Sequence, residues 1–241
     1  MLFGVELLLS KTAIYPHNRF LPSFYDEKLL KGVFLKGKER NELIISWLTI
    51  TAAFSMVISN FFSVLDPPTA LLISAVGVGT GFILHELAHK YVAIHYGANA
   101  EFRMWQAGLI LALVLPIVTF GQFLFAAPGA VYIYGANITR KQNGIISLAG
   151  PLTNIIIAIF FIVLAFIFPE SIIASIALIA ARINFFLGFF NLIPIGPLDG
   201  TKIFAWNKAI WACFFVFTLA GVFLFTLLAS LVLSPFTLIG G

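Results

Sequence analysis

The chain has 241 residues, of which 61% are apolar and only 10% are charged, whereas an average soluble domain carries about 25% charged residues. The mean hydropathy of +1.04 predicts a polytopic protein of the lipid bilayer rather than a soluble domain. A single cysteine excludes a disulfide framework or a cysteine zinc site within one chain. The net charge of +4 is small, and nothing in its placement suggests nucleic-acid binding.

Residues 1–42 are mixed and polar and contain seven Lys/Arg residues, so we interpret them as a cytoplasmic N-terminal tail with some helix near ERNELIISW. The remainder, 43–241, is expected to form one transmembrane domain. Its apolar runs predict membrane spans, which are at 43–65, 70–96, 145–168, 171–192 and 203–233. The expected fold is an all-α polytopic membrane protein with a small β element, about five to six transmembrane helices and a re-entrant segment.

The second span contains the motif HELAH, whose ionisable side chains would be costly in lipid without a function. His85 and His89 are four residues apart, so on a helix both imidazoles project from one face and can bind one metal ion. Glu86 lies beside them and can reach a metal-bound water as a general base without being a ligand. The alternative is a chance match at a polar helix end, and the position of the motif within an apolar span argues against it.

Catalytic zinc usually takes three protein ligands, and the chain has few free acids. Asp199 follows NLIPIGPL, where Pro194 and Pro197 interrupt a helix and can bring a carboxylate to the depth of HELAH. An Asp-Gly pair after prolines is by itself more often a simple turn. Glu101 is the competing third ligand.

The segment 108–127 is apolar but contains Pro116 and Gly121. Two spans joined by PES place the ends of the pair, GPLTN (150–154) and PLDG (197–200), on one side of the membrane. If HELAH works with them, the chain must leave at 97 and return by 144 on that side, so 108–127 is predicted to be a re-entrant hairpin broken near 116–121. The following GAVYIY, 129–134, is predicted to be a β-strand.

Charge placement supports the same topology. The segments predicted to be inside carry the basic residues Lys90, Arg103, Arg140, Lys141, Lys202 and Lys208. The turns predicted to be outside carry Asp66 and Glu170 and no Lys/Arg. This positive-inside pattern places the N-terminus and the HELAH site towards the cytoplasm.

Three motifs in this order resemble the site-2 proteases, the intramembrane zinc metalloproteases. The family pattern pairs HExxH with N-x-x-P-x-x-P-x-D-G, matched here from Asn191 to Gly200, and has a G-x-x-x-N motif between them, matched by Gly150 and Asn154. The resemblance implies that Asp199 is the third zinc ligand and that Asn191 helps to hold the substrate or the oxyanion. Asn154 is expected to bind substrate as well.

The expected function is therefore an intramembrane zinc endopeptidase with one Zn²⁺ per chain, which cuts transmembrane protein substrates within or near their membrane segments. A substrate helix must unwind before cleavage, and the edge of GAVYIY can pair with it; alternatively, that strand belongs to a purely structural hairpin. The rival function is a catalytically silent zinc-binding membrane protein that serves as a binding or transport module. Glu86 favours the enzyme, because a structural zinc site has no use for an acid there. Arg182, in mid-span, is expected to pair within the bundle or to extend towards an interface.

Overall fold

The computed structural model describes residues 34–61, 66–135, 137–169 and 171–237. Most of the predicted tail and Glu170 therefore lie outside the described residues. The described elements, in chain order, are α2 (Gly37–Phe61), α3 (Pro67–Val78), a π-helical turn η1 (Gly79–Ile83), α4 (Leu84–His95), β1 (Asn99–Met104), α5 (Gln106–Val118), β2 (Gly129–Tyr134), α6 (Arg140–Ile167), α7 (Ile172–Leu192), α8 (Asp199–Trp206) and α9 (Lys208–Thr237).

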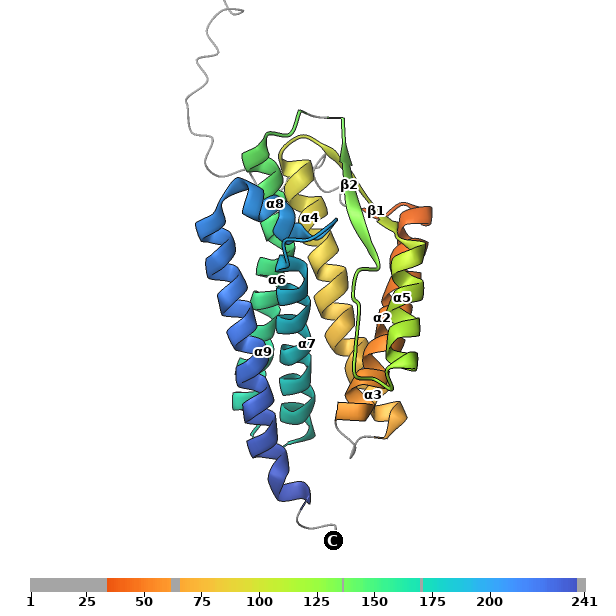
Figure 1. Cartoon of the computed structure of the whole chain (residues 1–241), viewed down its shortest axis with the longest axis vertical. Helices are drawn as coiled ribbons and strands as arrows, with labels where there is room; N and C mark the ends of the chain where they lie inside the picture. Colours follow the sequence, from red (N-terminus) through yellow and green to blue (C-terminus); the bar gives the residue numbers. More distant parts are fainter. Residues whose placement is uncertain (1–33, 62–65, 136, 170, 238–241) are drawn as a thin grey trace, which may run out of the picture.

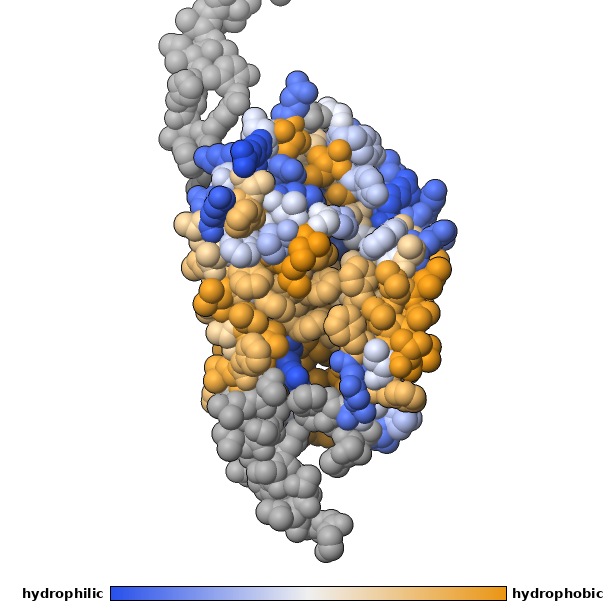
Figure 2. Space-filling model, in the orientation of Figure 1, coloured by the Kyte–Doolittle hydropathy of each residue, from blue (hydrophilic) through white to orange (hydrophobic). Residues whose placement is uncertain are grey.

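Long helices run side by side along the molecule (Figure 1). Within the described residues, four helical segments are long and apolar enough to cross a membrane: α2, the continuous α3–η1–α4, α6 and α7. Helix α9 runs beside them as a further apolar helix. Figure 2 shows that hydrophobic residues dominate the middle of the visible face, while hydrophilic residues gather at the end that carries the β-hairpin. The predicted polytopic helical fold is confirmed.

Local sequence explains where the helices begin. The Asp66 side chain accepts the Thr69 N–H at 3.0 Å, and prolines fill the first positions of α3. Thr139 and Gln142 form a reciprocal capping box at the start of α6. Ser171 caps α7 through the Ala174 N–H. Helix α2 begins at Gly37, so the helix expected near ERNELIISW is present and continues into the first predicted span.

Helices α3 and α4 form one continuous rod, interrupted by the π-turn η1 shortly before HELAH. A π-turn leaves carbonyl groups outside the regular ladder, and such turns are common at functional sites. Here the Gly81 carbonyl accepts a hydrogen bond from Asn154 Nδ2 at 3.0 Å. In the preceding helix, the Gly77 carbonyl accepts one from Asn184 Nδ2 at 3.3 Å. The glycine-rich sequence GVGTG therefore connects this rod to both α6 and α7.

The predicted strand GAVYIY is confirmed as β2. It pairs antiparallel with β1, with Asn99 opposite Tyr134 and Met104 opposite Gly129. The partner strand NAEFRM was not predicted from the sequence. Its alternation of polar residues with Ala100, Phe102 and Met104 was the signal for a half-buried strand.

Because β1 and β2 pair, the chain enters and leaves the segment 105–128 at the same end of the bundle. Helix α5, with 13 residues, is roughly 20 Å long, too short to cross a hydrocarbon core of about 30 Å. The predicted return of the segment to the end from which it leaves is confirmed. The helix passes Pro116 and ends at Val118, and Phe120 and Gly121 follow at positive φ, so the turn falls within the predicted break 116–121.

Candidate metal centre

The HELAH side chains are held by partners on α6. His85 Nδ1 lies 2.6 Å from Asn154 Oδ1, and His89 Nδ1 lies 2.7 Å from the Ile146 carbonyl oxygen. Both partner oxygens can only accept, so each histidine carries its proton on Nδ1. In a neutral imidazole this leaves the Nε2 lone pair free, and both Nε2 atoms point into the same space.

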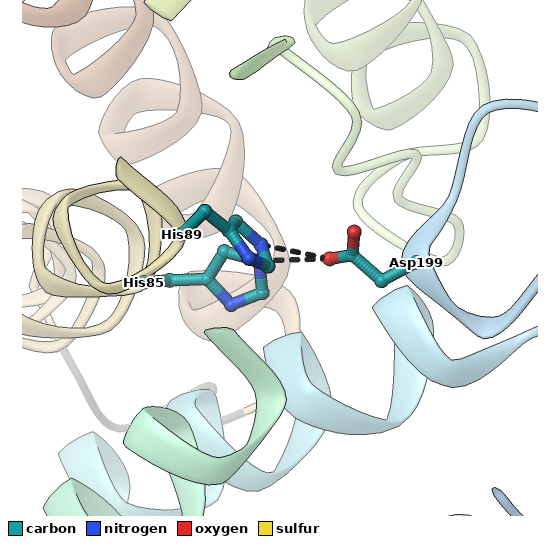
Figure 3. Close-up of side chains that lie close together, drawn as sticks. All are labelled: His85, His89 and Asp199. Atoms are coloured by element: carbon teal, nitrogen blue, oxygen red, sulfur yellow. Dashed lines mark hydrogen bonds and ion pairs between the residues drawn. The ribbon is translucent and has the colours of Figure 1, made fainter. Parts of the chain in front are cut away.

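Asp199 is brought to these nitrogens by the first turn of α8. Helix α7 ends at Leu192, and the proline-containing loop that follows leads to Asp199 at the start of α8. Asp199 Oδ2 lies 3.2 Å from His85 Nε2 and 2.9 Å from His89 Nε2 (Figure 3). The two Nε2 atoms are 2.9 Å apart. All three side chains are buried.

This set of atoms fits a metal ion. Two nitrogen lone pairs and a carboxylate oxygen converge. Because the histidine protons are on Nδ1, no proton lies between the two Nε2 atoms and Asp199 Oδ2. A buried group of this kind can hold a cation, and two histidines with one carboxylate are one of the ligand sets of catalytic zinc. In the described part of the chain, this is the group of three acidic, histidine or cysteine side chains that lies close enough to hold one.

Asp199 is an anion in this environment. Burial disfavours the charged form of its carboxyl group, and the adjacent Lys202 cation favours it. Lys202 Nζ lies 3.5 Å from Asp199 Oδ1, the oxygen that faces away from the histidines. A buried carboxylate that stays ionised is the form that coordinates a metal.

Two glycines permit the close packing around the site. A Cβ at Gly150 would lie 2.5 Å from ring atoms of both His85 and His89, so only glycine leaves room for the imidazoles against α6. A Cβ at Gly200 would lie 2.1 Å from the Leu192 carbonyl oxygen, so the Asp-Gly pair lets α8 pack against the end of α7. The glycines in GPLTN and PLDG therefore have a steric explanation.

The three candidate ligands line a cavity with a volume of about 210 Å³, and Glu86 lies beside them and lines it as well. Its side chain is buried, and its Oε2 atom has no hydrogen-bond partner in the described part of the protein. A buried carboxylate oxygen without a partner, on a side chain that lines a cavity next to a metal site, is available to accept a proton from water.

The cavity is bounded on other sides by α7, α8 and the hairpin. Asn191, in the last turn of α7, lines it and donates through Nδ2 to the Leu187 carbonyl oxygen at 3.0 Å. Residues 129–133 of β2 line it as well. The cavity thus places a strand edge, a carboxylate and an amide side chain around the candidate metal site.

Other candidates lie elsewhere. Asn154, expected at the substrate, is fully buried behind His85 and does not line the cavity. Glu101, the competing ligand, forms an ion pair with Arg103 at 2.7 Å on β1. Lys90, counted as a topology-determining charge, is buried in an ion pair with Glu39. Arg182 lies partly buried on α7.

Two residues of this region were missed from the sequence. Asn184 on α7 accepts a hydrogen bond from Asn154, and its polar side chain within an apolar span was the available signal. Glu39 was assigned to the polar tail, and its pairing with Lys90 joins positions too distant in sequence for any local pattern to reveal.

Comparison with known proteins agrees with this geometry. The model of peptidase family M50 matches residues 168–219. The chain is 48% identical over 176 residues to "Putative zinc metalloprotease MJ0611" of Methanocaldococcus jannaschii, covering 73% of this chain and 87% of that protein. It is 30% identical over 139 residues to "Putative zinc metalloprotease YwhC" of Bacillus subtilis, covering 51% and 63%. It is 34% identical over 122 residues to "Zinc metalloprotease MJ0392" of M. jannaschii, covering 50% and 30%. No solved structure matches.

A helical membrane bundle that encloses an HExxH motif and an acidic third ligand defines a membrane zinc metalloprotease. The chain belongs to peptidase family M50, the site-2 protease family.

Proposed function

We propose that this zinc metalloprotease is an intramembrane endopeptidase that hydrolyses peptide bonds within or near the transmembrane segments of other membrane proteins. The observation that carries the proposal is the position of Glu86. Its side chain has an unpartnered carboxylate oxygen and lines a cavity shared with His85, His89 and Asp199, and the helix that carries HELAH is long enough to cross a membrane.

His85, His89 and Asp199 would hold one Zn²⁺ per chain. When bound, the zinc supplies a Lewis acid that polarises a water molecule and the scissile carbonyl. Glu86 accepts the proton from the attacking water and later passes it to the leaving amine nitrogen. Asn191 lines the cavity, and its side-chain amide would supply a polar group for the substrate or for the developing oxyanion.

The substrate would be held as an extended strand. A transmembrane helix has its carbonyl groups in internal hydrogen bonds, so the cut segment must unwind and find new partners. Within the described residues, the sheet consists of β1 and β2, and β2 lines the cavity along 129–133. Addition of the unwound segment to β2 satisfies its backbone and presents it beside Glu86.

The site would face the cytoplasm. The hairpin end carries described basic residues on β1, α6, α8 and α9, which are Arg103, Arg140, Lys141, Lys202 and Lys208. Asp66 lies at the start of α3, at the opposite end of the bundle (Figure 1). The positive-inside rule assigns the hairpin end to the cytoplasmic side.

The test is cleavage of membrane-protein substrates by the purified protein in detergent. Cleavage should stop when a chelator removes the metal and return when Zn²⁺ is added. Glu86→Gln should retain one zinc, because the three ligands are intact. Its activity should fall by about 10²–10⁴-fold, because the group that carries the proton is gone. Normal turnover by Glu86→Gln, or cleavage that survives metal removal, would contradict the proposal.

A further inference from the structure

The outer edge of β1 is closed by carboxylates from α2. Glu39 Oε1 accepts the Phe102 N–H at 2.9 Å, and Glu42 Oε2 accepts the Met104 N–H at 3.1 Å. These are alternate residues of the strand, and the Trp105 N–H continues the ladder on the β2 side by donating to the Pro128 carbonyl oxygen. Helix α2 therefore supplies, with side chains, the acceptors that a third strand would offer.

Glu39 also ties the hairpin to α4. Lys90 Nζ lies 2.8 and 2.7 Å from the two carboxylate oxygens of Glu39, and both side chains are almost completely buried. Lys90 directly follows His89 in the sequence. One carboxylate thus joins α2, β1 and the helix that carries HELAH. A buried ion pair is weak evidence for stability but a specific geometric constraint.

The opposite edge of the hairpin is the one that faces the cavity. The N–H groups of Phe102 and Met104 face α2, so the odd-numbered residues of β1 form the hydrogen bonds to even-numbered residues of β2. The N–H and C=O groups of the odd-numbered β2 residues Gly129, Val131 and Ile133 therefore point away from β1. All three residues line the cavity that contains Glu86 and Asp199. With one edge capped and fixed to α4, the hairpin presents its other edge to the cavity at a set position.

We propose that Glu39 and Glu42 are positioning residues that fix the hairpin, and so select which peptide bond of the substrate reaches Glu86. The inference rests on the proposed function, in which the unwound substrate pairs with β2. One residue of an extended chain spans about 3.3 Å, so a small displacement of β2 along its axis brings a neighbouring bond to the catalytic centre. Loosening the cap should therefore change the cleavage position as well as the rate.

The decisive comparison is Glu39→Gln/Lys90→Met against Glu39→Leu/Lys90→Met. Both double variants remove the ion pair, so neither leaves a buried charge without a partner. They differ in one respect: the glutamine side chain keeps an oxygen that accepts the Phe102 N–H, and the leucine side chain does not. Three quantities are measured for each, which are amide hydrogen exchange across residues 99–104, zinc content, and the cleavage positions by mass spectrometry.

The glutamine variant should keep the wild-type exchange and the wild-type cleavage position. In the leucine variant the Phe102 amide should exchange about tenfold faster, the effect of one lost buried hydrogen bond. That variant should retain one zinc, cut at additional neighbouring positions and lose about tenfold in rate at the wild-type bond. Glu42→Gln and Glu42→Leu form a second matched pair at a less buried position, with the exposed Lys38→Gln as the surface-charge control.

The inference is overturned if both leucine variants cut at the wild-type position with the wild-type rate, or if they lose zinc while the exchange of β1 stays unchanged. Failure of the proposed function is a different result, namely no cleavage of membrane substrates by the wild-type protein. Hydrogen exchange needs no substrate, so it reports on the cap in either case.

Discussion

At the scale of single residues, the two histidines of HELAH depend on different supports. His89 is held by a backbone carbonyl, whereas His85 is held by the Asn154 side chain, whose own orientation is fixed in turn. Asn154 Nδ2 donates to the Gly81 carbonyl oxygen and to Asn184 Oδ1. Asn184 Nδ2 donates to carbonyl oxygens of α3 and α7. Each amide has a partner for its oxygen and its nitrogen, so the His85 ring is held in one tautomer.

We therefore expect Asn154→Leu to weaken zinc binding about 10–100-fold, the usual effect of removing the partner of a metal-binding histidine. The measurement is competition for zinc with a chromogenic chelator. Asn191→Leu is the matched control, because Asn191 borders the cavity without contacting either histidine. It should leave zinc affinity unchanged and reduce cleavage. Unchanged zinc affinity in Asn154→Leu would contradict a positioning role of Asn154 for His85.

At the scale of elements, the structure joins the hairpin and the HELAH helix through a charge pair buried between α2 and α4. Breaking such a pair from one side is far more damaging than replacing both partners, because one charge is then left buried alone. Lys90 is the more informative partner to remove, since Glu39 also serves as the acceptor of the Phe102 N–H.

Lys90→Met should lower the free energy of unfolding by about 3–5 kcal/mol, and Glu39→Gln/Lys90→Met should recover most of this loss. Equilibrium unfolding in detergent measures both. Lys141→Met, an exposed lysine on α6, is the control and should change stability by less than about 0.5 kcal/mol. If Lys90→Met is as stable as the control, the buried pair does not hold these elements together.

The elements also show what the sequence can reveal. HELAH and the Asp-Gly after two prolines are local patterns, so the convergence of His85, His89 and Asp199 was predictable from helix periodicity and a helix break. The return of 108–127 to its starting side followed from the pairing of α6 with α7. By contrast, the Glu39 cap and the Asn184 contact join distant positions through side-chain geometry, which no local pattern records. The motif GPLTN indicated that Asn154 lies near the site. It did not specify how α6 is rotated about its axis, and this rotation decides whether Asn154 faces the substrate or His85.

At the scale of the whole molecule, charge is sorted to the two ends of the apolar bundle. The hairpin end carries the exposed basic residues of β1, α6, α8 and α9, and the opposite end begins α3 with Asp66. The candidate site lies towards the hairpin end, because HELAH occupies the later half of the α3–α4 rod and Asp199 begins α8. Since HELAH and Asp199 must meet at one depth, the topology of every helix between them is coupled to the chemistry.

We expect cysteines at Asn99 and Arg140 to react with a membrane-impermeant thiol reagent only from the cytoplasmic side. Both positions are exposed and lie at the hairpin end, where β1 and β2 pair. A cysteine at Asp66, also exposed, should react only from the opposite side. The scan uses a Cys213→Ser background, because the native cysteine is exposed. Labelling of 99 and 140 from opposite faces would mean that α5 crosses the bilayer, which the strand pairing and its length of roughly 20 Å forbid. Labelling of both from outside would mean that the whole bundle has the opposite orientation in the membrane. Substrates would then be cut near their outer ends, and the basic residues of α6 and α8 would violate the positive-inside rule.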